Sequence, residues 1–325
     1  MMDIIVTGVS QSGKTSLRKV IFEKKYPYET VFNDPTNKLE NLHVESLGYC
    51  NLNFTEFPST FFFNKSSIEY DTCLEKCKVL IFLIDTQIPP NSQYDYFKNG
   101  ILPIFGKYKS ISLYVFLHKI DNTNLCQNDY NKQRGEIQSK IKQMCTQFQN
   151  DSNLDDININ FYVTSIYNST LFEAFSKIFQ NMMPQNRNLS TLIDHLTDSC
   201  GFEKTYLFDV FNKIYLAVDS SPNESQTYEM CTDIIDVVLD MSGIYGDQKE
   251  NEETDSYFDD SSTCSIKINA FNNSKNILFL KFIHKNLALI AVINEENYER
   301  NNLLDYNINV FREAVKSILK FKWNK

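Results

Sequence analysis

The sequence predicts two domains: an α/β domain built on a doubly wound parallel sheet, and a smaller α+β domain after it. The chain has 325 residues, which exceeds one ordinary domain of about 100–200 residues. Its first part alternates short apolar runs with helical stretches, a pattern typical of a parallel sheet covered by helices on both faces. Its second part places strands next to one another, which favours an antiparallel sheet.

Five apolar runs in the first part are candidate strands, and four stretches between or after them are candidate helices. The strands are expected at residues 4–7, 53–57, 79–85, 113–118 and 160–164. The helices are expected at residues 15–25, 92–107, 130–149 and 171–182. Pro184 and the polar residues after it resemble a hinge. We therefore expect the first domain over residues 1–184 and the second over residues 185–325.

The second part is expected to run as helix, two strands, helix, three strands and helix. The helices are placed at 189–197, 225–241 and 303–321, and the strands at 205–208, 214–218, 265–270, 277–283 and 287–293. The last helix has one apolar face, formed by Leu304, Ile308, Phe311, Val315 and Ile318. We interpret this face as packing on the domain's own sheet, with a partner helix as the alternative. The acidic segment 246–262 is interpreted as a solvated loop, with a dedicated binding role as the alternative.

Composition argues against several classes of protein. The net charge of -9 disfavours nucleic-acid binding, which needs a phosphate-neutralising surface. The longest apolar runs, 79–84 and 287–293, are far shorter than the roughly 20 residues that cross a bilayer. Neither an N-terminal myristoylation glycine nor a C-terminal prenylation cysteine is present, so we expect no direct membrane insertion. Eight scattered cysteines without a CxxC pair fit reduced thiols in the cytosol.

The segment Gly-Val-Ser-Gln-Ser-Gly-Lys-Thr at residues 8–15 matches the P-loop pattern GxxxxGK[ST] between an expected strand and an expected helix. Backbone amides of such a loop converge on phosphate oxygens. Lys14 is expected to contact the β and γ phosphates and to act in catalysis, and the Thr15 hydroxyl is expected to bind Mg²⁺. The residues of this loop that we expect at the nucleotide are Ser10, Gln11, Ser12, Gly13, Lys14, Thr15 and Ser16.

A second motif addresses the base of the nucleotide. His118, Lys119 and Asp121 end an expected strand with the KxD core of guanine recognition. An aspartate here accepts both N–H groups of guanine, whereas the acceptor nitrogen of adenine would be repelled. Ser165 and Ile166 follow the next strand, where a backbone amide would meet guanine O6.

The loop after the first helix supplies further candidate ligands. Thr36 is placed to give its hydroxyl to Mg²⁺ and its amide to a γ-phosphate, and Thr30 is also expected at the nucleotide. Glu56 follows the next strand with a carboxylate. The expected metal site therefore consists of Thr15, Thr36 and Glu56, and the expected cofactor is Mg²⁺ with GTP or GDP.

These motifs, with longer strings around them, resemble the Rag family of small GTPases and specifically its C/D branch. The strings include Pro-Thr-Asn-Lys at 35–38, Phe-Tyr-Val-Thr-Ser-Ile-Tyr at 161–167 and Ala-Val-Asp-Ser-Ser-Pro at 217–222. The resemblance covers nearly the whole chain. It implies a P-loop GTPase domain followed by a roadblock or longin-like dimerisation domain.

The resemblance also implies a biological setting. A C/D-type subunit pairs with an A/B-type subunit through the roadblock domains, and the pair relays amino-acid sufficiency to the target-of-rapamycin kinase complex. The pair acts at the lysosomal or vacuolar surface, docked on a lipid-anchored scaffold complex, and a GTPase-activating protein is a further partner. The expected location is the cytoplasm beside that membrane, with the nucleus as a second compartment.

One segment departs from the family pattern Asp-x-Pro-Gly-Gln, because residues 56–60 read Glu-Phe-Pro-Ser-Thr. Glu56 adds a methylene at the Mg²⁺ site, and Ser59 adds a β-carbon where glycine is usual. Thr60 stands at the catalytic glutamine position, where its short hydroxyl cannot orient water as a carboxamide does. We therefore expect a slow GTP hydrolase. A non-hydrolysing scaffold of the same dimer and a P-loop kinase or ATPase remain as alternatives.

Overall fold

The computed structural model describes residues 2–34, 36–44, 52–60, 68–122, 127–152, 157–222, 224–245, 263–269, 275–284 and 286–320. They form two compact units, and the chain passes from one to the other inside α6 (Thr170–Met182), between Ala174 and Phe175. The expected domain boundary after Pro184 stays a prediction. The acidic segment 246–262 lies outside the described residues.

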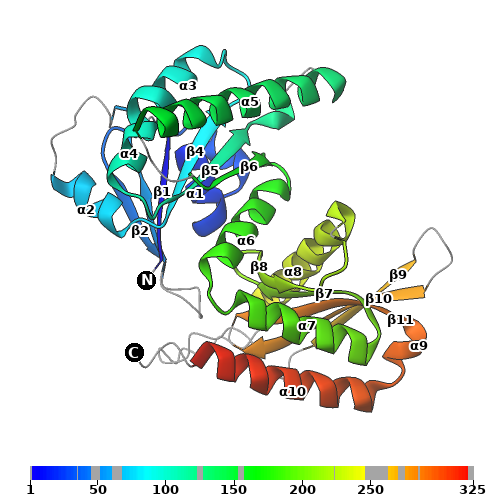
Figure 1. Cartoon of the computed structure of the whole chain (residues 1–325). Helices are drawn as coiled ribbons and strands as arrows, with labels where there is room; N and C mark the ends of the chain where they lie inside the picture. The colour runs from blue at the N-terminus through cyan, green and yellow to red at the C-terminus, as the bar shows by residue number, and fades with distance from the viewer. Residues whose placement is uncertain are drawn as a thin grey trace. The chain divides into compact units, whose positions relative to one another are not determined.

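The first unit contains a six-stranded sheet in the order β2-β3-β1-β4-β5-β6 (Figure 1). Its strands are β1 (Met2–Gly8), β2 (Glu40–Val44), β3 (Leu52–Glu56), β4 (Val79–Asp85), β5 (Ser112–His118) and β6 (Ile159–Thr164). Neighbours pair in parallel except for β2, which runs antiparallel to β3. The doubly wound sheet is thus confirmed. The edge strand β2 is not evident from the sequence because its residues are mostly polar and exposed, whereas inner parallel strands are continuously apolar.

Helices cover both faces of this sheet, with α3, α4 and α5 on one face and α1 on the other (Figure 1). Their bounds are α1 (Lys14–Phe22), α2 (Ile68–Lys76), α3 (Asn91–Tyr96), α4 (Leu102–Lys107) and α5 (Gln127–Ser152). The helix expected over 92–107 contains a π-helical turn, η3 (Phe97–Ile101), between α3 and α4. Two short 3₁₀ turns, η1 (Pro27–Thr30) and η4 (Ile120–Asn122), lie in the connecting loops.

A packed core holds the sheet in place beneath the loops at its carboxyl edge. Phe82, Leu113 and Val115 from β4 and β5 are fully buried with Phe97 and Ile141 from the covering helices. The rings of Phe82 and Phe97 stack with centroids 5.4 Å apart. Close-packed interiors of this kind resist deformation, so the strand ends that carry the loops form a rigid base.

The second unit is an α+β domain with five antiparallel strands in the order β8-β7-β11-β10-β9. Its strands are β7 (Phe202–Asp209), β8 (Ile214–Val218), β9 (Thr263–Asn269), β10 (Lys275–His284) and β11 (Leu287–Asn294). Its helices are α7 (Asn186–Cys200), α8 (Ser225–Tyr245), α9 (Glu295–Tyr298) and α10 (Asn301–Lys320). The predicted order of elements is confirmed, with the short α9 as an addition whose first turn is capped by the Asn294 side chain.

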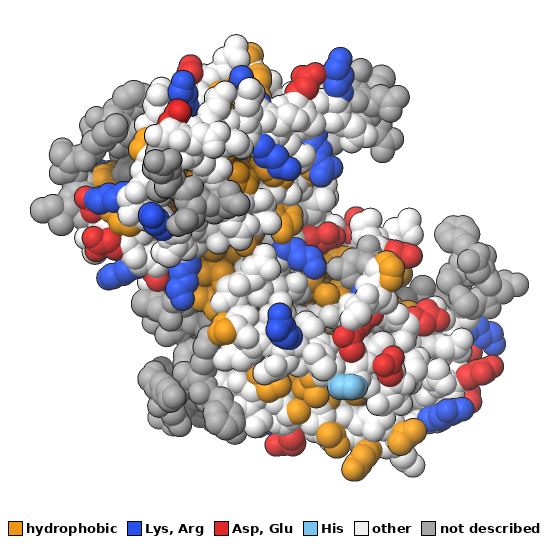
Figure 2. Space-filling view, viewed as in Figure 1, with side chains coloured by type: hydrophobic (Ala, Val, Ile, Leu, Met, Phe, Trp, Pro, Cys, Tyr) orange, Lys and Arg blue, Asp and Glu red, His pale blue; other side chains and the backbone are white. Residues whose placement is uncertain are grey.

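Helix α10 presents apolar residues on two faces. Four residues of the predicted apolar face are buried in the domain itself: Leu304, Ile308, Phe311 and Val315. The helix packs beside α7 and β10, so the first interpretation of this face, as part of the domain's own core, agrees with the structure. Other hydrophobic side chains are exposed over α10 (Figure 2), among them Leu303, Tyr306 and Val310.

Among the helices within the described ranges, none has the length and apolar character needed to span a membrane.

Candidate functional site

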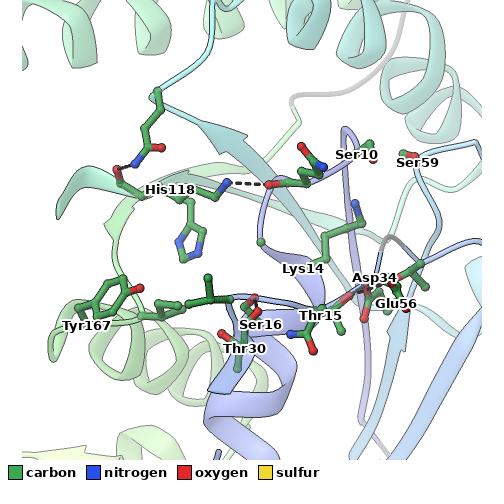
Figure 3. Close-up of a pocket in the computed structure, with 18 of the residues that line it drawn as sticks. Ser10, Lys14, Thr15, Ser16, Thr30, Asp34, Glu56, Ser59, His118 and Tyr167 are labelled. Atoms are coloured by element: carbon green, nitrogen blue, oxygen red, sulfur yellow. Dashed lines mark hydrogen bonds between the residues drawn. The ribbon is translucent and has the colours of Figure 1, made fainter. Parts of the chain in front are cut away.

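A pocket of about 370 Å³ lies at the carboxyl edge of the first unit's sheet, within the usual size range of small-molecule sites. Open α/β sheets bind ligands at this edge, where the strand order reverses and loops diverge to either side. Here the reversal occurs at β1, which has β3 on one side and β4 on the other. Figure 3 shows two groups of residues on opposite sides of Lys14. One group contains Thr15, Glu56 and Ser59, and the other contains His118 and Tyr167.

Most of the residues expected at a nucleotide line this pocket. They are Ser10, Gln11, Gly13, Lys14, Thr15, Ser16, Thr30, Thr36, Glu56, His118, Lys119, Asp121 and Ile166. Three expected residues do not line it, namely Ser12, Thr60 and Ser165. The side chain of Ser12 is buried, and its hydroxyl makes no hydrogen bond within the described part of the chain.

Gly13 has to be glycine for two reasons. Its φ is 99°, a left-handed conformation that side chains rarely adopt. A β-carbon built on it would also lie 2.8 Å from Cδ2 of His118. The loop can therefore approach the end of β5 closely. Helix α1 begins at the next residue, and its first three residues line the pocket, so its N-terminus offers free amides to an anion there.

Lys14 carries a buried positive charge at the centre of the site. Its Nζ donates hydrogen bonds to the carbonyl oxygens of Gly8, at 3.0 Å, and Val9, at 2.9 Å. Burial lowers the pKa of Lys14 to about 8, although the nearby Glu56 carboxylate opposes the shift. Two neutral carbonyl acceptors compensate a buried ammonium poorly, so an anion in the pocket would stabilise it.

Lys119 joins the loop after β5 to the P-loop. Its Nζ donates to the carbonyl oxygen of Gln11 at 2.6 Å and to Oδ2 of Asp85 at 2.7 Å. Both Gln11, with φ 62°, and Lys119, with φ 64°, have left-handed backbones without being glycine. Such conformations are held by the surrounding structure and concentrate at functional sites.

The His118 ring lies next to Gly13 of the P-loop. The ring is buried, and Nδ1 lies 2.9 Å from the Thr164 hydroxyl oxygen. Burial, together with the nearby Lys119 charge, lowers the pKa of His118 to about 4. The imidazole is therefore neutral at physiological pH and adds no charge to the site.

Asp121 is oriented by Ser165. The Ser165 hydroxyl donates a hydrogen bond to Oδ1 of Asp121 and accepts one from the Tyr167 amide at 3.1 Å. Ser165 itself is buried. It thus contributes to the site through Asp121 instead of lining the pocket.

Three oxygen-bearing side chains converge on the other side of Lys14. The hydroxyl oxygens of Thr15 and Thr36 lie 2.7 Å apart and donate to Oε1 of Glu56 at 2.5 and 2.7 Å. These are the residues expected to hold Mg²⁺. Hydroxyl and carboxylate oxygens are suitable ligands for this hard cation, so the donor set fits it.

The segment after β3 contributes unevenly to the pocket. Phe57 is buried and its ring packs edge-on against Tyr70 at 5.4 Å. Ser59 lines the pocket and Thr60 does not. The residue at the family's glutamine position is therefore not part of the pocket wall.

Other lining residues are not identified by the motifs: Val31, Asn33, Asp34, Gln87 and Tyr167. Gln87 follows the end of β4, and its Nε2 donates to the Lys119 carbonyl at 3.2 Å. Its place directly after an apolar parallel strand is a usable signal for a loop at the ligand edge. The other four lie near motif residues in sequence but carry no pattern of their own.

The fold and the site together define a P-loop G domain followed by an antiparallel α+β domain. A family model described as "Gtr1/RagA G protein conserved region" matches residues 3–235. The chain belongs to the Gtr1/RagA family of G proteins. The resemblance inferred from its motifs is thereby confirmed.

Several curated proteins are similar to the chain over nearly its whole length. Ras-related GTP-binding protein D of Mus musculus is 36% identical over 98% of this chain and 68% of its own. Ras-related GTP-binding protein C of Homo sapiens is 34% identical over 98% of this chain and 76% of its own. GTP-binding protein gtr2 of Schizosaccharomyces pombe is 32% identical over 97% of both chains. By contrast, Ras-related GTP-binding protein A of Dictyostelium discoideum is 26% identical over 63% of this chain, so the similarity is of C/D type.

Proposed function

We propose that this chain is the guanine-nucleotide-binding switch subunit of a Rag-type heterodimer and that it hydrolyses GTP slowly. In this role it would relay amino-acid sufficiency to the target-of-rapamycin kinase complex. The observation that supports the proposal best is the pocket that joins the P-loop to Asp121 and Lys119 on one side and to Thr36 and Glu56 on the other.

Each side of the pocket suits one part of a guanine nucleotide. The Asp121 carboxylate, held by Ser165, offers two acceptor oxygens to the two N–H donors of guanine. Lys14 and the amides at the start of α1 suit the phosphates. A nucleotide bound between them would accept hydrogen bonds from Lys14, whose Nζ now donates to the carbonyl oxygens of Gly8 and Val9.

Thr15, Thr36 and Glu56 would hold Mg²⁺ with the nucleotide. The cation would neutralise charge on the β and γ phosphates. Thr36 lies in the loop after η1, whereas Thr15 lies in the first turn of α1. A shared interaction with the nucleotide would therefore tie this loop to the P-loop, and loss of the γ-phosphate would release it, which is how GTPase switches work.

The second domain is proposed as the dimerisation module for an A/B-type partner. Helix α8 exposes Val237, Met241 and Ile244, and their spacing of four and three residues places them on one face of the helix. Exposed apolar patches often mark protein contacts. We propose that the dimer docks on a lipid-anchored scaffold at the lysosomal or vacuolar surface and meets its GTPase-activating protein there.

The test of this proposal is the identity of the nucleotide that copurifies with the chain. The purified protein is denatured, and the released nucleotides are resolved by ion-exchange chromatography. We expect GDP or GTP. Recovery of ATP or ADP would contradict the proposal and favour a P-loop ATPase or kinase.

A non-hydrolysing scaffold of the same dimer is a second candidate, because Thr60 lies outside the pocket lining. The paired change Ser59→Gly and Thr60→Gln restores the residues that resemble the family pattern. If the wild-type segment is what limits hydrolysis, single-turnover GTP hydrolysis should rise by at least about tenfold in the variant. A flat rate, with GTP still bound, would show that this segment is not the limit.

A further inference from the structure

Arg18 is surrounded by three carboxylates beside the proposed Mg²⁺ site. It lies on α1, one turn after Lys14. Its Nη1 is 2.5 Å from Oε1 of Glu23, its Nη2 is 2.7 Å from Oε2 of Glu40, and its Nε is 3.4 Å from Oε2 of Glu56. Only 11% of the Arg18 side chain is exposed, so these contacts are partly shielded from water. No sequence motif identifies this residue.

The register of the sheet explains why a cation is needed at this position. β2 pairs with β3 so that Glu40 stands directly opposite Glu56. Like charges opposite one another on antiparallel strands repel, and Glu56 is fully buried. Arg18 binds a carboxylate oxygen of each residue and thereby offsets the repulsion.

The same contacts fix the orientation of Glu56. One of its oxygens, Oε1, accepts the hydroxyl hydrogens of Thr15 and Thr36, and the other, Oε2, faces Arg18. A glutamate side chain has one more rotatable bond than an aspartate, so its carboxylate needs an additional constraint to present one oxygen in a fixed place. Arg18 provides this constraint from the side opposite the threonines.

We propose that Arg18 is a positioning residue for Glu56 and that it sets the affinity of the site for the divalent cation bound with the nucleotide. The guanidinium holds Oε2, so that Oε1 stays directed at the two threonine hydroxyls. This inference rests on the proposed function, because it requires that Thr15, Thr36 and Glu56 bind the cation. Residues that orient metal ligands typically change metal affinity by about 10–100-fold when removed.

The experiment measures dissociation of a fluorescent GDP analogue from the full chain over a range of Mg²⁺ concentrations. Arg18→Met removes the donors while keeping a long side chain. We expect it to raise the Mg²⁺ concentration for half-maximal retention of GDP by at least about tenfold. In excess EDTA, the GDP affinity of the variant should match the wild type, because Arg18 does not line the pocket.

Two further variants provide the comparison. Arg134→Met removes an equivalent charge from an exposed position on α5 and should behave as the wild type does. Arg18→Lys keeps the charge with a single donor group and should give an intermediate shift. If Arg18→Met does not fold, Arg18→Lys decides the question by the same criterion.

The possible results separate this inference from the proposed function. An unchanged Mg²⁺ midpoint in the Arg18 variants would overturn the inference alone. An equal loss of GDP affinity with and without Mg²⁺ would also overturn it, since that result would make Arg18 a structural residue. A wild-type chain that binds no GDP under any condition would overturn both proposals.

Discussion

Lys14 places a buried ammonium in the lining of the pocket. Its ammonium is buried against two carbonyl oxygens, and its pKa is lowered from 10.5 to about 8. A bound phosphate would stabilise the protonated form and raise this pKa again. Binding of a nucleotide is therefore coupled to proton uptake wherever the free site is partly deprotonated.

This coupling predicts a specific pH dependence. Below about pH 7 the lysine is protonated in both states, so GDP affinity should be nearly independent of this group. Above about pH 8 the free site loses its proton, and affinity should fall by up to about tenfold per pH unit. Calorimetry at pH 8.5 in buffers of different ionisation enthalpy measures the proton uptake directly. An apparent binding enthalpy that is the same in all buffers would contradict the assignment.

At the scale of single residues, the sequence predicts those functional residues that are contiguous in a motif. Gly13, Lys14 and Thr15 are examples, since a strand, a turn and a helix start fix their relation locally. Arg18 is different, because its role depends on Glu40 meeting Glu56 across two strands. That register involves the edge strand β2, which has no apolar pattern. The pairing of Glu40 with Glu56 could therefore not be predicted from the sequence.

At the scale of elements, α10 allows a matched test of the fold. Phe311 is buried on the face that packs in the domain, whereas Val310, its neighbour, is 55% exposed. Phe311→Ala should destabilise the second domain by about 3–5 kcal/mol, and Val310→Ala by no more than about 0.5 kcal/mol. Hydrogen exchange of β10 amides in the full chain reports the loss. Equal effects of the two changes would mean that the buried face is wrongly assigned.

Long periodic elements are predictable here because their burial pattern is strong. The strands β4 and β11 are apolar nearly throughout, and both are expected from the sequence. The π-helical turn between α3 and α4 is not, because it leaves the apolar periodicity of the segment nearly unchanged. Helix α2, which begins close to the altered segment 56–60, is also not expected from the sequence, because its residues show no strong apolar periodicity.

At the scale of the whole molecule, the proposed dimer depends on the second domain. Ile244 is 73% exposed on α8, in a row with Val237 and Met241. Ile244→Asp should greatly reduce copurification with an A/B-type partner, because a desolvated carboxylate is unfavourable in an apolar contact. GDP binding should be unaffected. Val310→Asp, at an exposed apolar position on α10, is the control, and equal partner recovery for both variants would argue against α8 as the contact.

The central claim is that the pocket selects guanine through Asp121. Replacing this carboxylate by a carboxamide in Asp121→Asn removes one acceptor and introduces a donor. The donor would repel the guanine amino group, but it matches the carbonyl that xanthine carries at the same position.

Titration of the wild type and Asp121→Asn with GDP and xanthosine diphosphate tests this claim most directly. We predict that the variant loses about 1–3 kcal/mol of GDP binding, or roughly 5–150-fold in affinity, and gains binding of xanthosine diphosphate. An unchanged GDP affinity, with no gain for xanthosine diphosphate, would contradict the guanine-nucleotide switch.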